Sequence, residues 1–506
     1  MKPETILKDW QKRAIRTREL SFARALFKTY PDSNLYLVGG MVRDLLLGRQ
    51  TKDYDFVVTN VAEAKLLTFL KRHGRVNTVG RTFGVIKFVP TGQHGSLAID
   101  IALPRLDLPA KGTGAYRDIK VVRRASLPIE EDLLRRDYTV NAIAWDIRGK
   151  CIVDPTGGIV DLKKRQLRTV GDAATRFAED YSRVLRGLRF AVTHNFSFAP
   201  ATWRELRVAT AGLVKKVSGE FVVPREVIAR EFLRTFVANP VIALNLYDRS
   251  TALEKLIPEL RATKTCPQPR KYHSEGSVWK HTALALAALA SRRFRAKHAG
   301  IDAELVVTVL LHDIAKPTML RTPKKDGVDR VRFDGHDVEG GKMAEAICER
   351  LKLSVMSVDS GLHVEPTNVR WLIQHHLLLL HGRVTDMKLR TVLKYFVDHP
   401  LAEKLKALLL ADTLGTIPAS GKPYTKHLVD LERHLKRIPR RDGKLPAPLL
   451  GGDGIMRVVR IAAGPAIGFL KRRLREEQLM GTVRTKQAAV EFIKDEYART
   501  YTEGSN

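Results

Sequence analysis

The sequence predicts an α+β protein in which a small mixed β-sheet with helices is followed by an all-helical remainder. Between Leu35 and about Asp146, short β-rich runs alternate with helical patterns. Beyond Asp161 strand signals nearly vanish and helical patterns dominate. At about 150 residues per domain, a chain of 506 residues suggests roughly three to four domains.

The N-terminal elements can be placed one by one. Residues 1–30 are predicted to form one amphipathic helix that ends near Pro31. A strand then runs into Gly39-Gly40, and a short helix follows and ends at Gly48. The predicted strands cover 35–38, 54–58, 83–89 and 97–102, the short helix covers 41–47, and a flexible glycine-containing loop covers 104–117.

Two polar breaks divide the helical remainder. Helical patterns run from about 172 to 260 and from about 276 to 415, separated by a Pro-containing linker at 265–270. A second break at 438–443 precedes a basic helical tail. The predicted domains are therefore residues 1–34, 35–150, 151–265, 270–425 and 430–506.

Charge is the feature of the composition that departs from average. Hydrophobic residues make up 44% and charged residues 28%, which is typical of a globular protein. Lys plus Arg is 87 against 55 acidic residues, a formal net charge of +32. Such a protein most often meets a polyanion, with nucleic acid as the leading candidate and an anionic membrane surface as the second.

The remaining composition argues for an intracellular protein. No apolar stretch is long enough to span a bilayer, and the charged N-terminus has no secretory signal pattern. Cys151, Cys266 and Cys348 form no CxxC pair, so neither a zinc ribbon nor a disulfide framework is supported. We expect a cytoplasmic protein with no membrane partner, and the oligomeric state stays open.

The most informative stretch joins a glycine turn to a pair of carboxylates. Gly39 and Gly40 would let backbone amides approach a phosphate closely. Side chains alternate along a strand, so Asp53 and Asp55 are predicted to share a face. A divalent cation relieves their repulsion, and Mg²⁺ favours a shell of carboxylates and phosphate. Asp100, on a later and otherwise apolar strand, is a candidate third carboxylate.

Four motifs in order carry a resemblance to a known family. LVGGMVRDLLLG with KDYDFVV, RRDYTVNA, DPTGG with Asp161-Leu162, and Glu179-Asp180 with its following arginines span about 150 residues. They resemble the class II tRNA nucleotidyltransferases and bacterial poly(A) polymerases. The resemblance implies a nucleotidyltransferase head followed by a helical neck, body and tail. It also implies addition of nucleotides from CTP and ATP to an RNA 3′ end without a nucleic-acid template.

The resemblance assigns roles residue by residue. Asp53 and Asp55 match the Mg²⁺-binding catalytic pair, and Arg136, Asp137 and Asn141 match the motif that positions the incoming ribose and triphosphate. Asp180 and Arg183 match the pair that recognises the base. The full set expected to bind nucleotide is Gly39, Gly40, Arg43, Arg136, Asp137, Asn141, Asp180, Arg183, Arg186 and Arg189.

The Asp180–Arg183 pair has a physical reason to choose C and A. Their spacing of three predicts that they share one helix face. A carboxylate accepts from the exocyclic amine of cytosine or adenine, and a guanidinium donates to the adjacent ring nitrogen. Uracil and guanine present a carbonyl instead of the amine, so the carboxylate is left unpaired, which costs a few kcal/mol. The alternative is an ordinary surface ion pair.

A second constellation lies between residues 273 and 412. His281, His312-Asp313 and Asp412 lie in or at the ends of helical patterns, where ionisable groups require hydrogen bonds or a metal. Their spacing resembles the HD phosphohydrolase superfamily, which implies that these four residues bind a divalent metal of unknown identity. His336 and either His375 or His376 are further candidates for ligands or phosphate contacts. The alternative is a degenerate domain whose histidines are held by hydrogen bonds.

Several functions stay open at this point. The leading hypothesis is CCA addition to tRNA, with Asp53, Asp55 and Asp100 catalytic and the basic tail binding tRNA. The alternatives are a poly(A) polymerase, an enzyme that adds only A or only CC, an RNA-binding HD phosphohydrolase with an inactive head, and a non-catalytic RNA-binding scaffold.

Overall fold

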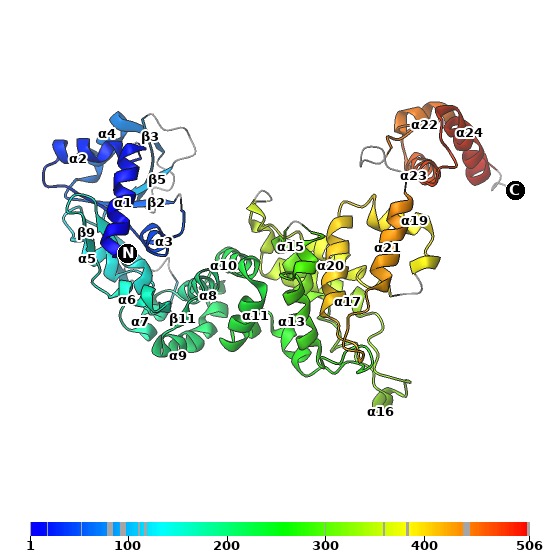
Figure 1. Cartoon of the computed structure of the whole chain (residues 1–506), viewed down its shortest axis with the longest axis horizontal. Helices are drawn as coiled ribbons and strands as arrows, with labels where there is room; N and C mark the ends of the chain where they lie inside the picture. The colour runs from blue at the N-terminus through cyan, green and yellow to red at the C-terminus, as the bar shows by residue number, and fades with distance from the viewer. Residues whose placement is uncertain are drawn as a thin grey trace. The chain divides into compact units, whose positions relative to one another are not determined.

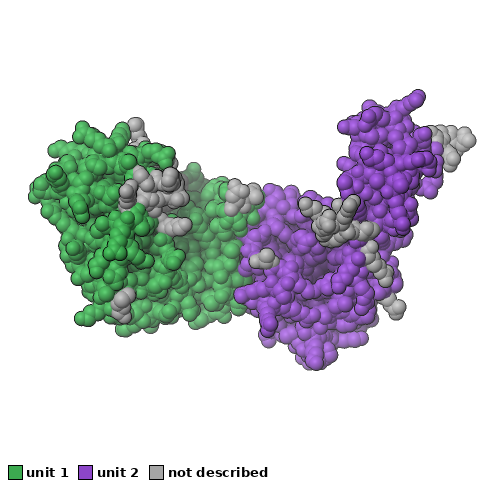
Figure 2. Space-filling model, turned by 45° about the horizontal axis from the view of Figure 1, so that its top comes forward, with its two compact units in different colours: residues 1–261, 347–363 green, residues 262–346, 364–506 purple. Residues whose placement is uncertain are grey.

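The computed structural model has two compact units, coloured separately in Figure 2. The first comprises residues 1–261 and 347–363, and the second comprises residues 262–346 and 364–506. The structure describes residues 2–17, 19–51, 53–77, 84–91, 98–109, 112–115, 119–298, 300–357, 360–380, 384–438 and 446–502.

A seven-stranded mixed sheet forms the core of the N-terminal part (Figure 1). Its strand order is β3-β4-β5-β2-β1-β8-β9, and only the β2–β5 pair is parallel. The predicted small mixed sheet is confirmed. The strands are β1 (Asn34–Val38), β2 (Tyr54–Thr59), β3 (Gly74–Asn77), β4 (Val85–Pro90), β5 (Ile99–Ala102), β8 (Ala144–Asp146) and β9 (Cys151–Val153).

Helices pack against this sheet through apolar and aromatic side chains. Phe22 of α2 makes edge-on contacts with Phe56 of β2 and Phe88 of β4. Trp145 of β8 is fully buried and donates to Gln11 of α1 over 2.8 Å. The helices of this region are α1 (Pro3–Arg16), α2 (Ser21–Thr29), α3 (Gly40–Leu46), α4 (Glu63–His73), α5 (Ile129–Leu134) and α6 (Gly158–Lys163).

Two expectations for this region are corrected. The single helix predicted over residues 1–30 is two helices, because the chain leaves α1 at Thr17 and buries both Leu20 and Phe22. The segment predicted as a loop over 104–117 is in part a β-hairpin, in which β6 (Arg105–Pro109) pairs with β7 (Ile119–Arg123). Residues 110, 111, 116 and 117 of that segment lie outside the described residues.

The rest of the first unit is helical, with two pairs of two-residue strands. Its helices are α7 (Ala173–Glu179), α8 (Ser182–His194), α9 (Pro200–Ala209), α10 (Arg225–Ala238), α11 (Pro240–Arg249) and α12 (Ala252–Leu256), with 3₁₀ turns at Thr139–Asn141, Thr210–Val214, Pro258–Lys264 and Leu353–Val355. The short strands are β10 (Gln166–Leu167) with β11 (Ser197–Phe198) and β12 (Lys216–Val217) with β13 (Glu220–Phe221).

Every regular element described in the second unit is helical. They are α13 (Val278–Ala288), α14 (Arg292–Arg295), α15 (Ala303–Leu311), α16 (Pro323–Asp326), α17 (His336–Arg350, whose last turn falls in the first unit), α18 (Pro366–Gln374), α19 (Leu389–Phe396), α20 (Ala402–Gly415), α21 (Lys426–Arg437), α22 (Gly452–Val459), α23 (Pro465–Met480) and α24 (Lys486–Tyr497), with short turns at Val384–Asp386 and Ala498–Thr502.

Two packing centres organise the second unit. α13 lies against α20, where Gly415 permits so close an approach that a Cβ there would lie 2.6 Å from the backbone nitrogen of Ala285. The last three helices bury a separate apolar cluster that includes Ile455, Leu470 and Ile493. Among the described residues, none of the helices combines the length and apolarity needed to cross a bilayer.

Candidate active site and metal centre

A cavity of about 940 Å³ opens in the first unit beside the ends of β1 and β2. It gathers residues that are far apart in the sequence, from the glycine turn after β1 to the start of α8. Every residue of the predicted nucleotide-binding set lines it. The lining residues are Gly39, Gly40, Arg43, Asp55, Arg105, Asp107, Val121, Arg135, Arg136, Asp137, Asn141, Asp180, Ser182, Arg183, Arg186, Arg189, Phe190, Val227 and Arg230.

The glycine turn is required by close contact as well as by backbone conformation. Gly39 has φ +69°, and a Cβ there would lie 2.8 Å from an Arg136 guanidinium nitrogen. Arg43, at the following α3, is almost fully buried and donates to Asn141 over 2.6 Å and to Asp44 over 2.9 Å. The turn and the 3₁₀ segment that holds Asn141 are therefore tied together at one wall of the cavity.

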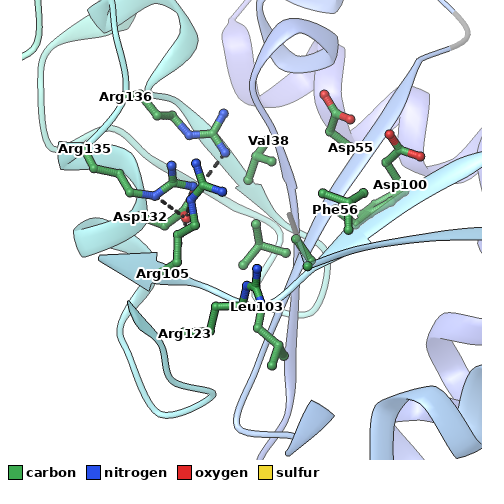
Figure 3. A pocket seen from close by; sticks show the side chains of 14 residues that line it. Val38, Asp55, Phe56, Asp100, Leu103, Arg105, Arg123, Asp132, Arg135 and Arg136 are labelled. Atoms are coloured by element: carbon green, nitrogen blue, oxygen red, sulfur yellow. Dashed lines mark hydrogen bonds and ion pairs between the residues drawn. The ribbon is translucent and has the colours of Figure 1, made fainter. Parts of the chain in front are cut away.

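Two carboxylates lie side by side on the only parallel pair of strands in the sheet. Asp55 of β2 and Asp100 of β5 are register partners, and Figure 3 shows their carboxylates next to each other. Burial, together with the negative charges of Asp100 and Asp53, raises the pKa of Asp55 to about 6 against the lowering effect of Arg136 and Lys87. Lys87 approaches Asp100 to 3.3 Å.

Asp53 differs from its two partners. It precedes β2, which begins at Tyr54, and its side chain is exposed. Its charge still acts on Asp55, but the three carboxylates do not bring three oxygens within 4.8 Å of one another in the described structure. A half-buried carboxylate of raised pKa beside two further carboxylates is a donor set that fits a hard divalent cation.

The motif after α5 is locked by ion pairs. Arg136 pairs with Asp132 over 3.0 Å, and Asp137 accepts from Arg186 over 2.7 Å. Burial would raise the pKa of Asp137, but the Arg186 guanidinium outweighs it and holds that pKa well below its usual range. Asp137 therefore holds Arg186 of α8 against the head, in addition to lining the cavity.

The Asp180–Arg183 pair is arranged differently from the single helix face predicted for it. Asp180 lies between α7 and α8 in extended conformation, and its carboxylate accepts from the backbone of Ser182 over 2.9 Å. Arg183 lies in the first turn of α8 and donates to Glu179 over 2.6 Å and to the Arg176 carbonyl over 2.8 Å. Both residues line the cavity, and each side chain is held by a third residue, whereas the two are joined only through the Arg183 backbone N–H, which donates to the Asp180 carbonyl over 3.1 Å.

Tyr181, between them, contacts the predicted loop. Its backbone N–H donates to the Gly114 carbonyl over 3.2 Å. Its ring lies between two glycines, since a Cβ at Gly114 or at Gly212 would come within 2.2 Å of ring carbons. Motif matching assigns no role to Tyr181, because the features that make room for its ring are two glycines far from it in the sequence.

Arg189 completes the arginine stripe of α8 by a buried ion pair. It donates to Glu231 of α10 over 2.6 Å, and Glu231 is 2% exposed. Burial acts to raise the pKa of Glu231, but the Arg189 guanidinium more than offsets this effect. The pKa of Glu231 is therefore below its usual value, and the carboxylate stays ionised. Arg189 is thus anchored to the helical part of the unit while it lines the cavity.

The predicted four-residue histidine–aspartate set converges in the second unit. His281 of α13 lies 2.9 Å from Asp412 of α20 and 3.7 Å from Asp313, measured from Nε2. His312, at the end of α15, lies 3.4 Å from Asp313 and 3.2 Å from the Nε2 of His281. His281, His312 and Asp412 form one group able to hold a metal ion.

Two further histidines complete a second group around Asp313. His336 and His376 place their Nε2 atoms 3.6 and 3.8 Å from Asp313 Oδ1. Of the two histidines at 375–376, only His376 enters the cluster. His375 instead donates to the Trp371 carbonyl and contacts the rings of Trp371 and Tyr395.

Backbone contacts prepare these imidazoles to bind a metal. The Nδ1 atoms of His312, His336 and His376 lie 2.6–2.8 Å from the carbonyls of Val309, Phe333 and Ile373. A carbonyl only accepts, so each Nδ1 carries the proton and each Nε2 presents a lone pair to the cluster. Burial lowers the pKa of His376 to about 4, which keeps it neutral.

The cluster also contains buried atoms that require a partner. Within the described residues, His336 Nε2 and Asp313 Oδ1 are buried and take part in no hydrogen bond. Burial alone would lower the pKa of His281, but Asp412 and Glu275 raise it to about 9, so the site attracts positive charge. Lone pairs converging on a site that attracts positive charge fit a divalent metal.

Two residues behind this cluster escaped the sequence analysis. Glu275 lies 3.3 Å from His281 Nδ1 and 2.7 Å from His273 Nδ1. Lys316, one turn after the HD pair, lies 2.7 Å from Asp313 Oδ2 and donates to Gln268 over 2.9 Å. The only feature of the sequence that could have indicated them is that Glu275 lies near His281 along the chain and Lys316 lies near Asp313.

Two family models match this chain, one over the region of the nucleotide cavity and one over the histidine–aspartate cluster. Residues 35–168 match the family model of the poly(A) polymerase head domain, and residues 279–414 match that of the HD domain. The Bacillus stearothermophilus CCA-adding enzyme, solved in complex with CTP, has the same fold, with a TM-score of 0.60 at 19% identity over 96% of this chain and 98% of that one.

Curated relatives are similar over most of their length. A multifunctional CCA protein of Nitrosococcus oceani is 32% identical over 77% of this chain and 87% of its own. An A-adding tRNA nucleotidyltransferase of Deinococcus radiodurans is 30% identical over 90% of this chain and 94% of its own. The chain therefore belongs to the family of tRNA nucleotidyltransferases that join a poly(A) polymerase head to an HD domain.

Proposed function

We propose that this chain adds C and A nucleotides to the 3′ end of tRNA, using CTP and ATP, to complete the CCA terminus. The observation that carries the proposal is the cavity of about 940 Å³. One wall holds the glycine turn and Asp55, and another holds Asp180 and Arg183. A nucleoside triphosphate of ordinary size fits such a volume, so its phosphates and its base can be held at once.

The head residues have distinct roles in this reaction. Asp53 and Asp55, with Asp100 beside them, would hold Mg²⁺, which would neutralise charge on the phosphates. Arg43 and Arg136 line the cavity near the glycine turn, where a triphosphate requires positive charge. The RNA 3′ oxygen bonds to the α-phosphorus, the bond from that phosphorus to the β-phosphate bridge breaks, pyrophosphate leaves, and the hydroxyl proton goes to water.

We assign the steps of the proposed reaction to successive parts of the chain. We assign catalysis to residues 35–150, base recognition to 151–265 and the HD centre to 270–425. Residues 430–506 carry the basic helices that we assign to tRNA. Three cysteines, all free, and a tRNA substrate fit the cytoplasm.

The direct test is the sequence of the product. Purified protein is incubated with a tRNA transcript that ends at its discriminator base, plus CTP and ATP, and the 3′ ends are sequenced. We expect ends in CCA. Because the Deinococcus relative adds A, extension only of a transcript that already ends in CC is the second candidate outcome.

The control for this assay is Asp55→Ala. The variant should incorporate no nucleotide while it binds tRNA as the wild type does, since no RNA contact is assigned to that carboxylate. Normal incorporation by Asp55→Ala would refute the catalytic assignment.

Nucleotide choice should depend on Arg183. In Arg183→Ala the base edge loses a charged donor, so the ratio of CTP to UTP incorporation should fall about tenfold or more. Competition assays with both nucleotides measure the ratio. Arg204→Ala, which alters an exposed arginine of α9, is the matched control and should leave it unchanged. An unaltered ratio in Arg183→Ala would remove the base-reading role.

The ionised Asp55 side chain should reduce stability. Its pKa is about 6 in the folded state against 3.8 for a free carboxyl, so the folded protein binds the proton more tightly. At one pKa unit per about 1.4 kcal/mol, Asp55→Asn should stabilise the protein by about 1–3 kcal/mol at pH 8. The gain should shrink as pH falls through 6 and vanish below about 3.8. Urea unfolding at several pH values measures it, and a gain independent of pH would contradict the assignment.

The histidine–aspartate centre favours a second activity, hydrolysis of phosphate esters. We propose that its two ligand groups hold divalent metal and that the substrate is a 2′,3′-cyclic or terminal phosphate. Two arms test this, metal content by elemental analysis and phosphate release from 2′,3′-cyclic AMP. His312→Ala and His376→Ala should lower both, whereas His375→Ala, whose ring points elsewhere, should lower neither. Full metal content in His312→Ala would exclude the centre.

A further inference from the structure

The histidines of the HD centre differ in what lies behind each ring. In His312, His336 and His376 the Nδ1 atom faces a backbone carbonyl. In His281 the Nδ1 atom instead lies 3.3 Å from a carboxylate oxygen of Glu275. An acceptor behind a metal-binding imidazole fixes the ring and raises its basicity, and an ionised acceptor does so more strongly than a neutral one. Of these four imidazoles, His281 is therefore the one best prepared to bind a metal.

Glu275 is itself held in place as an ionised carboxylate. Its side chain is 3% exposed, and its Oε1 lies 2.7 Å from Nδ1 of His273. Its Oε2 accepts from the backbone N–H of Ile417 over 3.1 Å. Hydrogen bonds to a carboxylate stabilise its charged form. The negative charge behind His281 is thus both buried and fixed.

Glu275 also joins the two helices that carry His281 and Asp412. It precedes α13, which holds His281, and Ile417 lies two residues beyond α20, which holds Asp412. Ser274 strengthens this connection, because its backbone N–H and its hydroxyl donate to the Ile417 carbonyl over 2.7 and 2.8 Å. His281 Nε2 and Asp412 Oδ1 lie 2.9 Å apart, so the connection fixes these two ligands relative to each other.

The two ligand groups differ in the negative charge that they offer a cation. We call His281, His312 and Asp412 the first group, and Asp313, His336 and His376 the second group.

The carboxylate of the second group is Asp313, and the buried Lys316 ammonium lies 2.7 Å from its Oδ2. Lys316 also donates to Gln268 over 2.9 Å, which holds the ammonium beside Asp313. Because Lys316 neutralises Asp313, the carboxylates that attract a cation are Asp412 and Glu275, and both act on the first group.

We propose that the two ligand groups bind divalent metal unequally, that the first group fills first, and that Glu275 is the positioning residue that causes the difference. Glu275 keeps the proton of His281 on Nδ1, so that Nε2 presents its lone pair to the metal. The second group binds its ion more weakly. The proposal rests on the proposed function of the HD centre, and it adds the order of filling and a residue outside the ligand set.

Metal titration assigns the two binding steps. The full chain carries Asp55→Ala, so that the head contributes no ion, and it is stripped of metal with a chelator. Co²⁺ is then added, and binding is followed by calorimetry and by the visible absorption of the bound ion. We expect two steps whose affinities differ about tenfold or more. His281→Ala should remove the tight step and leave the weak one, whereas His336→Ala should do the reverse.

Glu275→Gln tests the positioning role. The glutamine amide can turn an N–H donor toward His281, which favours a lone pair on Nδ1 and the proton on Nε2. The affinity of the tight step should fall about tenfold to a hundredfold. The weak step should stay within about twofold, and the visible spectrum of the first bound Co²⁺ should change. Glu339→Gln, the same substitution at an exposed position of α17, is the matched control and should alter neither step.

The outcomes separate this inference from the proposed hydrolysis. Absence of both steps would refute the metal centre and the hydrolysis together. With metal bound, two equal steps, or a tight step that survives His281→Ala, would overturn the order of filling. An unchanged tight step in Glu275→Gln, or equal weakening of both steps, would overturn the positioning role, because a merely structural residue affects both groups alike. No phosphate release from a chain with both steps intact would refute the hydrolysis alone.

Discussion

The head depends on one unfavourable interaction, two carboxylates held side by side in a partly buried position. The parallel register of β2 and β5 brings Asp55 next to Asp100. Burial and like charge raise the pKa of Asp55 to about 6, and Arg136 and Lys87 offset only part of that cost. Because burial and like charge destabilise the ionised site, a bound cation would restore the balance of charge. We propose that the arginines of the nucleotide cavity bind the phosphates and that the carboxylates bind the cation.

The second unit also holds ionisable side chains close together, but there most of the possible metal ligands are imidazole nitrogens. Helix ends bring imidazoles from α13, α15 and α17, and from the end of α18, around Asp313. Backbone carbonyls set the tautomers of three of them before any ligand arrives. The head thus presents oxygen donors suited to a hard cation, whereas the HD centre mixes nitrogen and oxygen donors that accept a wider range of metals. One chain can therefore carry two metal chemistries without a shared site.

Much of this site was predictable because its residues lie in short, ordered motifs. Gly39, Asp55, Asn141, Asp180 and Arg183 all line one cavity, as the motifs suggested. What failed was local geometry. Asp53 lies outside the strand, and Asp180 and Arg183 do not share one continuous helix. Predictions from hydrophobic period and residue spacing assume a regular helix or strand. Functional residues often lie at the ends of these elements, where the assumption fails.

The sequence by itself determined the class of the fold, the order of the motifs and the types of donor at each centre, because these are local properties of residue type and spacing. Only the tertiary structure decided which side chains meet. It selected His376 over His375, turned residues 105–109 of a predicted loop into strand β6, and placed the Tyr181 ring between Gly114 and Gly212. These choices depend on contacts between residues that are distant along the chain, where packing and burial outweigh any local preference.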